Sequence, residues 1–364
     1  MIRHLHPAAW WLWAIALAAA ASLTTNPVLL AAYVLVLVVV VLARRDGSPW
    51  GRAFRLYAVL AGFIVLVRMV MHVIVGLKFG HILVLPLPEA HLPSWAAGIQ
   101  LGGTIYLEGL LGAALEGARL ATMILAIGAA NALASPKRLL KVLPAALHEI
   151  GTAVVVAITV APQLAESVQR VQRARALRGD TSTRLRSVRQ VAMPVLQDTL
   201  DRSLALAATM DARGYGRRTA EPNRLTGIIS LAGLLGAALG LYGLLDTTSP
   251  AALGLPVLLT GVVLCVLALV LGGRAVTRTR YRQDPWGWPE WLTAATGLVA
   301  LAAALIVLRT DPRALGMPLS PALATPALPW IAFAGLTLAA LPAVATPVPP
   351  LTSARPSARV EVAA

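Results

Sequence analysis

The segment "PVLLAAYVLVLVVVVLA", residues 27–43, has no charged side chain and one hydroxyl group, that of Tyr33. An apolar helix of about 17–25 residues is long enough to cross the hydrocarbon core of a bilayer. The rest of the chain has the same character, because 58% of its 364 residues are hydrophobic and only 13% are charged. This composition is not that of an ordinary soluble domain. The sequence therefore predicts an all-α polytopic membrane protein.

Seven further apolar segments are long enough to be membrane spans. They are residues 8–24, 54–77, 104–134, 225–245, 251–272, 291–308 and 329–345. With residues 27–43 they make about eight transmembrane helices, four on each side of a polar middle. Small residues at the end of the first segment leave a cleavable signal peptide as an alternative. The apolar run that follows almost at once favours a helical hairpin.

This pattern divides the chain into four expected parts. Residues 1–134 form an N-terminal transmembrane bundle, residues 135–224 a cytosolic region, and residues 225–345 a C-terminal group of four transmembrane helices. Residues 346–364 are rich in Pro and Ser, which is typical of a disordered tail.

The net charge of +15 would indicate nucleic-acid binding in a soluble protein. Here the basic residues follow apolar segments, as they do in cytoplasmic loops under the positive-inside rule. Three clusters fall on one side of the membrane: Arg44, Arg45, Arg52 and Arg55; Lys137, Arg138 and Lys141; and Arg274, Arg278, Arg280 and Arg282. We therefore expect a lipid bilayer and no nucleic acid as partner, with both termini cytoplasmic.

The polar middle contains two long helical patterns, residues 152–178 and 185–212, after a short surface helix that begins at Pro136. The first pattern opens with an apolar run at 153–164, which is about a dozen residues and too short for a span. A span there would also place the basic cluster after residue 272 outside the cell, against the charge rule. We expect a helix whose first half packs under the bundle, followed by a helix that Pro194 bends.

Both helical patterns end in arginine and glycine, in "VQRARALRGD" at residues 171–180 and "MDARGYGRR" at residues 210–218. Gly179 and Gly214 are suited to cap these helices, and a cation in a last turn is favoured by the helix dipole. Ordinary helix ends would look like this. A functional interpretation is that alanines beside Arg175 and Arg213 let a partner approach the guanidinium groups, which bind carboxylates or carbonyls.

These two ends resemble the Ala-Arg-Gly motifs of the transmembrane T component of energy-coupling factor (ECF) transporters, the EcfT/CbiQ family. The second motif is close, as "MDARGY" with Ala212, Arg213 and Gly214. The first is looser, with Ala174, Arg175 and Ala176 in "VQRARA", or Arg178 and Gly179 as a shifted alternative, and the alignment of Gln172 with the motif favours Arg175. The resemblance extends over about residues 5–218 and includes "YLEGLLGAALEGARL" at 106–120.

The resemblance implies a non-enzymatic scaffold in a bacterial plasma membrane. Its two coupling helices would contact two ABC ATPase subunits, which bind the ATP and magnesium, and a separate S component would bind a vitamin, a precursor or a transition-metal ion. This chain would then hold no cofactor, and it contains no G-x-x-x-x-G-K-[ST] loop. The alternatives are a polytopic membrane enzyme acting on an anionic lipid or nucleotide-linked substrate, and a conventional ABC permease.

Ionisable residues also lie inside the expected spans, at Arg68, Glu108, Glu116 and Arg119. Such groups are costly in a bilayer unless they are paired. We expect Arg68 to pair with Glu108 or Glu116, or Glu116 to pair with Arg119 at helical spacing. His81, Glu89 and His91 lie in a proline-rich loop, but their spacing is no metal signature, and we expect no metal site.

Overall fold

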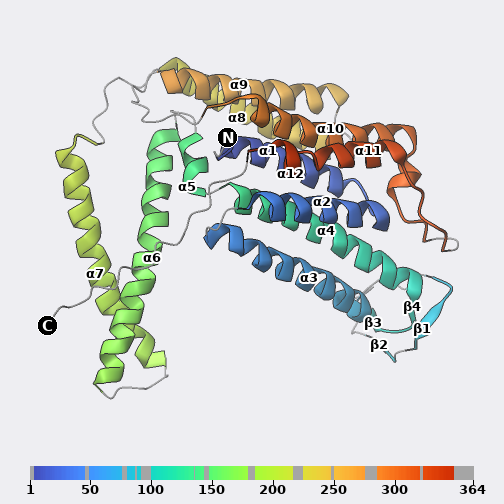
Figure 1. Cartoon of the computed structure of the whole chain (residues 1–364), viewed down its shortest axis with the longest axis horizontal. Helices are drawn as coiled ribbons and strands as arrows, with labels where there is room; N and C mark the ends of the chain where they lie inside the picture. The colour runs from blue at the N-terminus through green and yellow to red at the C-terminus, as the bar shows by residue number, and fades with distance from the viewer. Residues whose placement is uncertain are drawn as a thin grey trace. The chain divides into compact units, whose positions relative to one another are not determined.

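The computed structural model describes residues 4–45, 49–75, 80–86, 88–91, 100–134, 136–142, 147–178, 185–215, 224–246, 250–274, 285–319 and 323–347. These residues are mostly helical, with four very short strands (Figure 1). The prediction of an all-α polytopic membrane protein is confirmed. The chain forms two compact units, Met1–Leu139 with Gln283–Ala364, and Leu140–Arg282.

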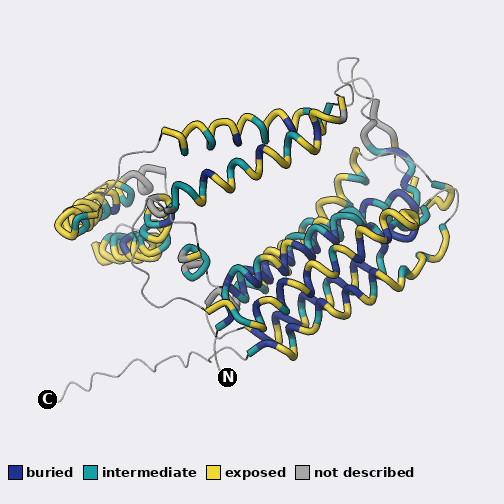
Figure 2. The backbone as a smooth tube through the Cα atoms, turned by 90° about the horizontal axis from the view of Figure 1, so that it is seen from above, coloured by how far each residue is buried: buried dark blue, intermediate teal, exposed yellow. Residues whose placement is uncertain are grey.

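The first unit is a helical bundle. Its helices are α1 (Pro7–Ser22), α2 (Pro27–Arg44), α3 (Pro49–Val75), α4 (Leu107–Leu133), α5 (Pro136–Leu139), α10 (Trp288–Thr310), α11 (Trp330–Ala339) and α12 (Pro342–Ala345), with a 3-10 turn η5 at Pro312–Leu315. Helix α4 contacts α1, α2 and α3, while α10 contacts α1 and α11, and both α11 and α12 contact α2. In Figure 2, buried residues form stripes along these helices.

The core of the first unit joins the two ends of the chain. Trp13 is fully buried, and its indole N–H donates a 3.1 Å hydrogen bond to the carbonyl of Ala339. Gly297 lies so close to Trp13 that an added Cβ would be 2.7 Å from the Trp13 Cα atom. Arg44 is buried and donates to the carbonyls of Pro342 and Val344 at 3.2 and 2.8 Å. An arginine expected to mark membrane topology therefore also holds the end of α12.

The packing divides the group of four helices expected at residues 225–345. Its second half, α10 to α12, completes the N-terminal bundle, and its first half lies in the other unit. The expected tail begins later than residue 346, because Thr346 is buried and donates a 2.6 Å hydrogen bond to the carbonyl of Pro342. Residues 348–364 lie outside the described part of the chain.

Four short strands precede α4, where the sequence indicated a span from residue 104. Strand β1 (Leu83–Leu85) pairs antiparallel with β4 (Ile105–Tyr106), and β2 (Glu89–His91) pairs antiparallel with β3 (Gln100–Gly102). Helix α4 therefore begins at Leu107. Glu108 in its first turn is buried and accepts backbone N–H groups from His81 and Ile82 at 3.0 and 3.2 Å.

The second unit contains η2 (Leu140–Val142), α6 (His148–Leu177), α7 (Leu185–Ala212), α8 (Arg224–Leu245), η4 (Ala251–Leu253) and α9 (Leu255–Arg274). Helices α8 and α9 form a hairpin whose backbones approach closely. A Cβ added at Gly240 would lie 2.2 Å from the amide nitrogen of Leu258, and one at Gly261 would lie 2.2 Å from that of Ala237. Small residues at a helix interface are typical of membrane hairpins.

Seven helices among the described residues are long and apolar enough to cross a membrane: α2, α3, α4, α6, α8, α9 and α10. Six of them are expected spans. The other two expected spans, Pro7–Ser22 and Trp330–Ala345, are shorter apolar helices, and the second is interrupted before Pro342, which lacks a backbone N–H. The sequence pattern predicts no span in α6, yet this helix is long and apolar enough to be one.

Connectivity in the first unit bears on α6. Asn131 near the end of α4 donates to the hydroxyl of Tyr57 near the start of α3 at 2.9 Å, so these helices are antiparallel, as are α1 and α2 across their short turn. Helix α4 therefore ends where α1 begins. The backbone N–H of His6 donates to Glu290 at 3.4 Å, so α10 begins at that same end. Because α4 ends and α10 begins at the same end of the bundle, the chain between them must cross the membrane an even number of times. Helices α8 and α9 supply two crossings, so α6 is not needed as a span.

Candidate functional site

Helices α6 and α7 form an antiparallel pair in the second unit. The hydroxyl of Ser167 on α6 donates a 2.8 Å hydrogen bond to the Asp198 carboxylate on α7. Further along α6, the Arg175 guanidinium donates to the side-chain carbonyl of Gln190 at 2.9 Å, and Gln190 lies earlier on α7. The helices that the sequence placed at residues 152–178 and 185–212 therefore run side by side in opposite directions.

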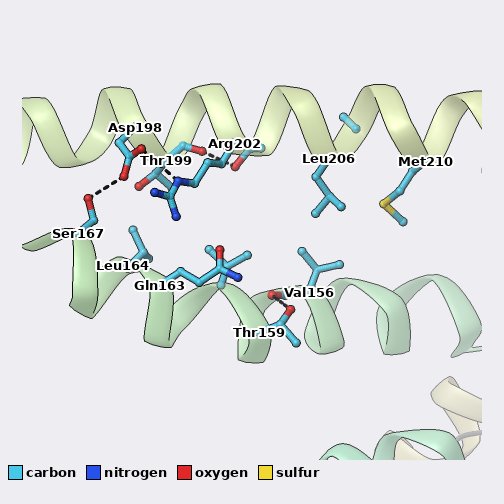
Figure 3. A pocket seen from close by; sticks show the side chains of 13 residues that line it. Val156, Thr159, Gln163, Leu164, Ser167, Asp198, Thr199, Arg202, Leu206 and Met210 are labelled. Carbon is cyan, nitrogen blue, oxygen red and sulfur yellow. Dashed lines mark hydrogen bonds and ion pairs between the residues drawn. The ribbon is translucent and has the colours of Figure 1, made fainter. Parts of the chain in front are cut away.

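A polar cluster lies at the centre of this pair (Figure 3). Besides the bond from Ser167, Asp198 accepts a 3.0 Å hydrogen bond from Arg202 Nε, and the Arg170 guanidinium lies 3.9 Å from the Asp198 carboxylate. The hydrogen bond from Ser167, followed by the bond and charge of Arg202, lowers the pKa of the Asp198 carboxyl from its ordinary value, against an opposing effect of burial. The carboxylate therefore stays ionised at neutral pH.

A cleft of about 370 Å³ lies between the middle of α6 and the second half of α7. Figure 3 shows Val156 and Leu164 on α6 facing Leu206 and Met210 on α7. Polar side chains also line the cleft, among them Thr159, Gln163 and Arg202. The sequence did not indicate the cleft or the Ser167 cluster. The spacing of Asp198 and Arg202, four residues apart on one helix, was the signal for their ion pair.

The end of α7 confirms the expectation that Gly214 caps this helix. Gly214 has a φ of +76°, and its N–H donates to the carbonyl of Asp211 at 2.8 Å. The N–H of Tyr215 donates to the carbonyl of Met210 at 3.0 Å. These two bonds with a left-handed residue define a Schellman motif. It ends the helix at Ala212 and leaves Arg213 exposed.

The end of α6 has a related arrangement. The helix ends at Leu177, and the N–H of Arg178 donates to the carbonyl of Arg175 at 2.9 Å. Arg178 thus follows the last residue of α6 directly, as Arg213 follows the last residue of α7, and both are exposed. Arg175 instead lies inside the last turn and is half-buried, with its side chain bound to Gln190. Gly179 lies outside the described residues.

The two arginine-bearing ends lie at opposite ends of the α6–α7 pair. Gln190 marks the level of the α6 end on α7, and Ala212 ends α7. At a rise of 1.5 Å per residue, the stretch of α7 between these two residues is about 33 Å long. The geometry therefore presents two similar basic helix ends, far enough apart to reach two separate surfaces.

The ionisable residues in the bundle pair in one of the expected ways. Arg68 on α3 and Glu116 on α4 form an ion pair, with half-exposed side chains. Glu108 does not take part, because backbone N–H groups at residues 81 and 82 occupy it. Arg119 forms no ion pair with any described residue. Among the described residues, no three His, Cys, Asp or Glu side chains come together as a metal site would require.

Comparison with known proteins identifies a family for most of this chain. A family model described as "CbiQ: Cobalt transport protein" matches residues 1–224. The match includes α1 to α7 and ends where α8 begins. No curated protein matches the chain.

Proposed function

This chain belongs to the CbiQ family of cobalt transport proteins, and we propose that it is the coupling subunit of an importer of the energy-coupling factor type. In this role it links two ABC ATPase subunits to a membrane-embedded S component that binds the substrate. ATP and magnesium are held by the ATPase subunits, and the chain itself carries out no chemistry.

The observation that carries this proposal is the pair of arginine-bearing ends of α6 and α7. Two similar ends on one antiparallel pair suit a partner that offers the same groove twice, as two ATPase subunits do. The guanidinium groups are exposed and each helix ends abruptly beside them, so a groove can enclose the end of the helix.

The two helix ends support Arg178 as the first coupling arginine, in place of Arg175, which the motif alignment favours. Arg213 follows α7 directly, and Arg178 holds the equivalent position after α6, whereas Arg175 is bound to Gln190. We assign the first contact to Arg178. Arg175 then secures the last turn of α6 against α7, with Ala174 and Ala176 on either side of it.

The polar cluster at Ser167 and Asp198 suits a mechanical role. Motion at one end of the pair reaches the other end only if the helices move together. The hydrogen bond between Ser167 and Asp198 and the approach of Arg170 on α6 to the same carboxylate tie them near the centre. Closure of the ATPase subunits would move both ends, and the pair would transmit that motion toward the S component.

The family description makes the cobalt ion the first substrate to test, ahead of a vitamin or its precursor. The test of coupling uses the chain produced together with its ATPase subunits. Arg213→Glu should release ATPase subunits from the purified complex while the chain stays inserted in the membrane, because the changed charge repels an acidic groove. Arg173→Glu is the matched control, since Arg173 is exposed on α6 before its last turn. Full retention of both ATPase subunits by Arg213→Glu would contradict the proposal.

A further inference from the structure

Helices α2, α3 and α4 enclose a groove in the first unit, here named the bundle groove. Its volume is about 630 Å³. Helix α4 lies between α2 and α3 and contacts both of them (Figure 1), so it forms the floor of the groove and the other two helices form its walls. Small residues from all three helices keep the groove open: Ala31 on α2, Ala58, Ala61 and Gly62 on α3, and Ala118 and Ala121 on α4.

The lining of the bundle groove is apolar. Thr122 is the one polar side chain among the lining residues. Its hydroxyl donates a 2.7 Å hydrogen bond to the carbonyl of Ala118, one turn earlier on α4. The walls carry larger apolar side chains, such as Leu30 and Phe54. A polar ligand would lose its hydrogen bonds to water on entering this groove. The chemistry of the lining therefore suits a hydrocarbon chain.

The length of the bundle groove matches one leaflet of a bilayer. On α3 its lining residues run from Phe54 to Val65, which is about 17 Å at 1.5 Å per residue. The candidate span of α3 begins at Ala53, so the groove starts at one membrane surface. Val65 lies beside Gly117, near the middle of the span Leu107–Leu133, because a Cβ added at Gly117 would be 3.0 Å from the Val65 Cα atom. Half of a hydrocarbon core is about 15 Å thick.

Two arginines lie at the surface end of the bundle groove. Arg45 caps α2 seven residues after the lining residue Val38, and Arg55 on α3 lies seven residues before the lining residue Gly62. Seven residues are about two helical turns, so each arginine is in line with one wall of the groove. Both side chains are exposed, and neither forms an ion pair with a described residue. The positive-inside rule accounts for basic residues at this end of the bundle but not for their alignment with the groove.

We propose that the bundle groove binds one anionic phospholipid, with an acyl chain along α4 and the phosphate between Arg45 and Arg55. Charge complementarity and the apolar lining together select this occupant. A free phosphate ion would meet the arginines and leave the groove empty, whereas an apolar helix would fill the groove and leave the arginines without an anion. A phospholipid supplies both parts in one molecule. Under the expected orientation it belongs to the cytoplasmic leaflet.

The experiment uses the full chain in phosphatidylcholine vesicles that contain a trace of photoreactive phosphatidylglycerol, with a diazirine halfway along one acyl chain. Irradiation should attach this probe to the groove-lining peptides of α2, α3 and α4. A phosphatidylcholine probe with the same acyl chain should attach there at least about tenfold less, as expected when two arginines attract an anionic headgroup. Peptide mapping by mass spectrometry measures both yields.

A first variant tests the apolar part of the site. Gly62→Leu places a side chain in the groove and should lower the attachment of both probes severalfold. A Cβ added at Gly62 meets no atom within 4 Å, so the packing of the bundle is kept. Gly227→Leu is the matched control, because Gly227 is a helical glycine on α8 that also has open space. It should leave the attachment unchanged.

A second variant tests the charged part. Arg45→Gln combined with Arg55→Gln should make the two probes attach equally, because the headgroup no longer distinguishes them. Arg224→Gln combined with Arg309→Gln is the matched control. It removes two exposed arginines that lie on α8 and α10, away from the lining of the groove, and should keep the preference for phosphatidylglycerol.

Three outcomes would overturn the proposal. In the first, the two probes attach equally to the unaltered chain. In the second, Gly62→Leu keeps full attachment at the groove-lining peptides. In the third, adding the other importer subunits abolishes the attachment, so that a protein helix occupies the groove in the complete importer. The proposed function fails separately, because retention of ATPase subunits by Arg213→Glu would leave the lipid results unchanged.

Discussion

Ser167 on α6 and Asp198 on α7 are joined by a 2.8 Å hydrogen bond at the centre of the antiparallel pair. Ser167 is buried there, and the same carboxylate also holds Arg202. Arg170 on α6 lies 3.9 Å from the same carboxylate, so the bond is the hub of the contacts between the two helices at this level. The proposed transmission of force requires such a tie, because motion at one end of the pair must reach the other end.

Removing the hub should uncouple ATP hydrolysis from uptake without releasing the ATPase subunits. In Ser167→Ala the Asp198 carboxylate loses its hydrogen bond from α6, which loosens α6 against α7 at this level. We expect severalfold lower uptake per ATP hydrolysed, with an unchanged subunit composition, measured in vesicles that contain the purified importer. Ser203→Ala is the control, because its hydroxyl bonds only to the carbonyl of Thr199 on its own helix. Equal coupling in the two variants would contradict the role of the hub.

The contact between Ser167 and Asp198 should weaken only when the pH falls below about 4, where Asp198 begins to be protonated. The pKa of Asp198 is lowered in the folded protein by the Ser167 hydroxyl and by Arg202. A lowered pKa stabilises the contact fully above the unfolded value of about 3.9, and this stabilisation is lost as the pH falls through the folded value. Hydrogen exchange at the centre of α7 should therefore be constant from neutral pH to about pH 5, after correction for its intrinsic pH dependence. In Asp198→Asn the step at lower pH should disappear.

The cap at Gly214 should be intolerant of side chains although there is room for one. An added Cβ would meet no atom within 4 Å, but the φ of +76° disfavours any residue other than glycine. Gly214→Ala should cost about 1–2 kcal/mol locally and fray the end of α7. Faster exchange of the amides at residues 214 and 215, with weaker binding of ATPase subunits, is the expected result. Gly227→Ala is the control, because Gly227 also has open space and lies inside α8 without a positive φ.

The helices after the family match should be needed for the stability of the N-terminal bundle. Gly297→Ala places a methyl group against the backbone of Trp13, and overpacking of this kind costs about 1–3 kcal/mol. The thermal midpoint of the purified chain should fall, whereas Gly62→Ala, where nothing lies within 4 Å, should leave it nearly unchanged. Equal midpoints in both variants would show that α10 does not support α1.

The fold class and the long helices could be predicted from the sequence because both follow from local composition. The bounds of α7 agree with the prediction at residues 185–212, since apolar spacing and Gly214 mark that helix locally. The strands before α4 have two or three residues each, too short for a period-2 pattern to stand out. Helices α10, α11 and α12 pack on the N-terminal bundle through contacts between residues far apart in sequence, such as Trp13 with Ala339. No local sequence pattern encodes such contacts.

The candidate site divides in the same way. Short motifs indicate its arginines and the Gly214 cap. The ionisable residues within the expected spans also indicate the two possible partners of Arg68, Glu108 and Glu116. The choice of Glu116 over Glu108 depends on where the loop at His81 and Ile82 lies. The hydrogen bond between Arg175 and Gln190 depends on the register of α6 against α7. The assignment of the first contact to Arg178 depends on the same register.

The central claim is that the two helix ends contact two separate ATPase subunits, and chemical cross-linking tests it most directly. Cys265 is the chain's single cysteine, so Cys265→Ala provides a background in which Arg178→Cys and Arg213→Cys can be introduced together. With a cysteine-to-amine cross-linker, the complete importer should yield a species in which one chain carries two ATPase subunits. Arg173→Cys, before the end of α6, should yield none. Attachment of a single ATPase subunit through both positions, or of none through Arg213→Cys, would contradict the account.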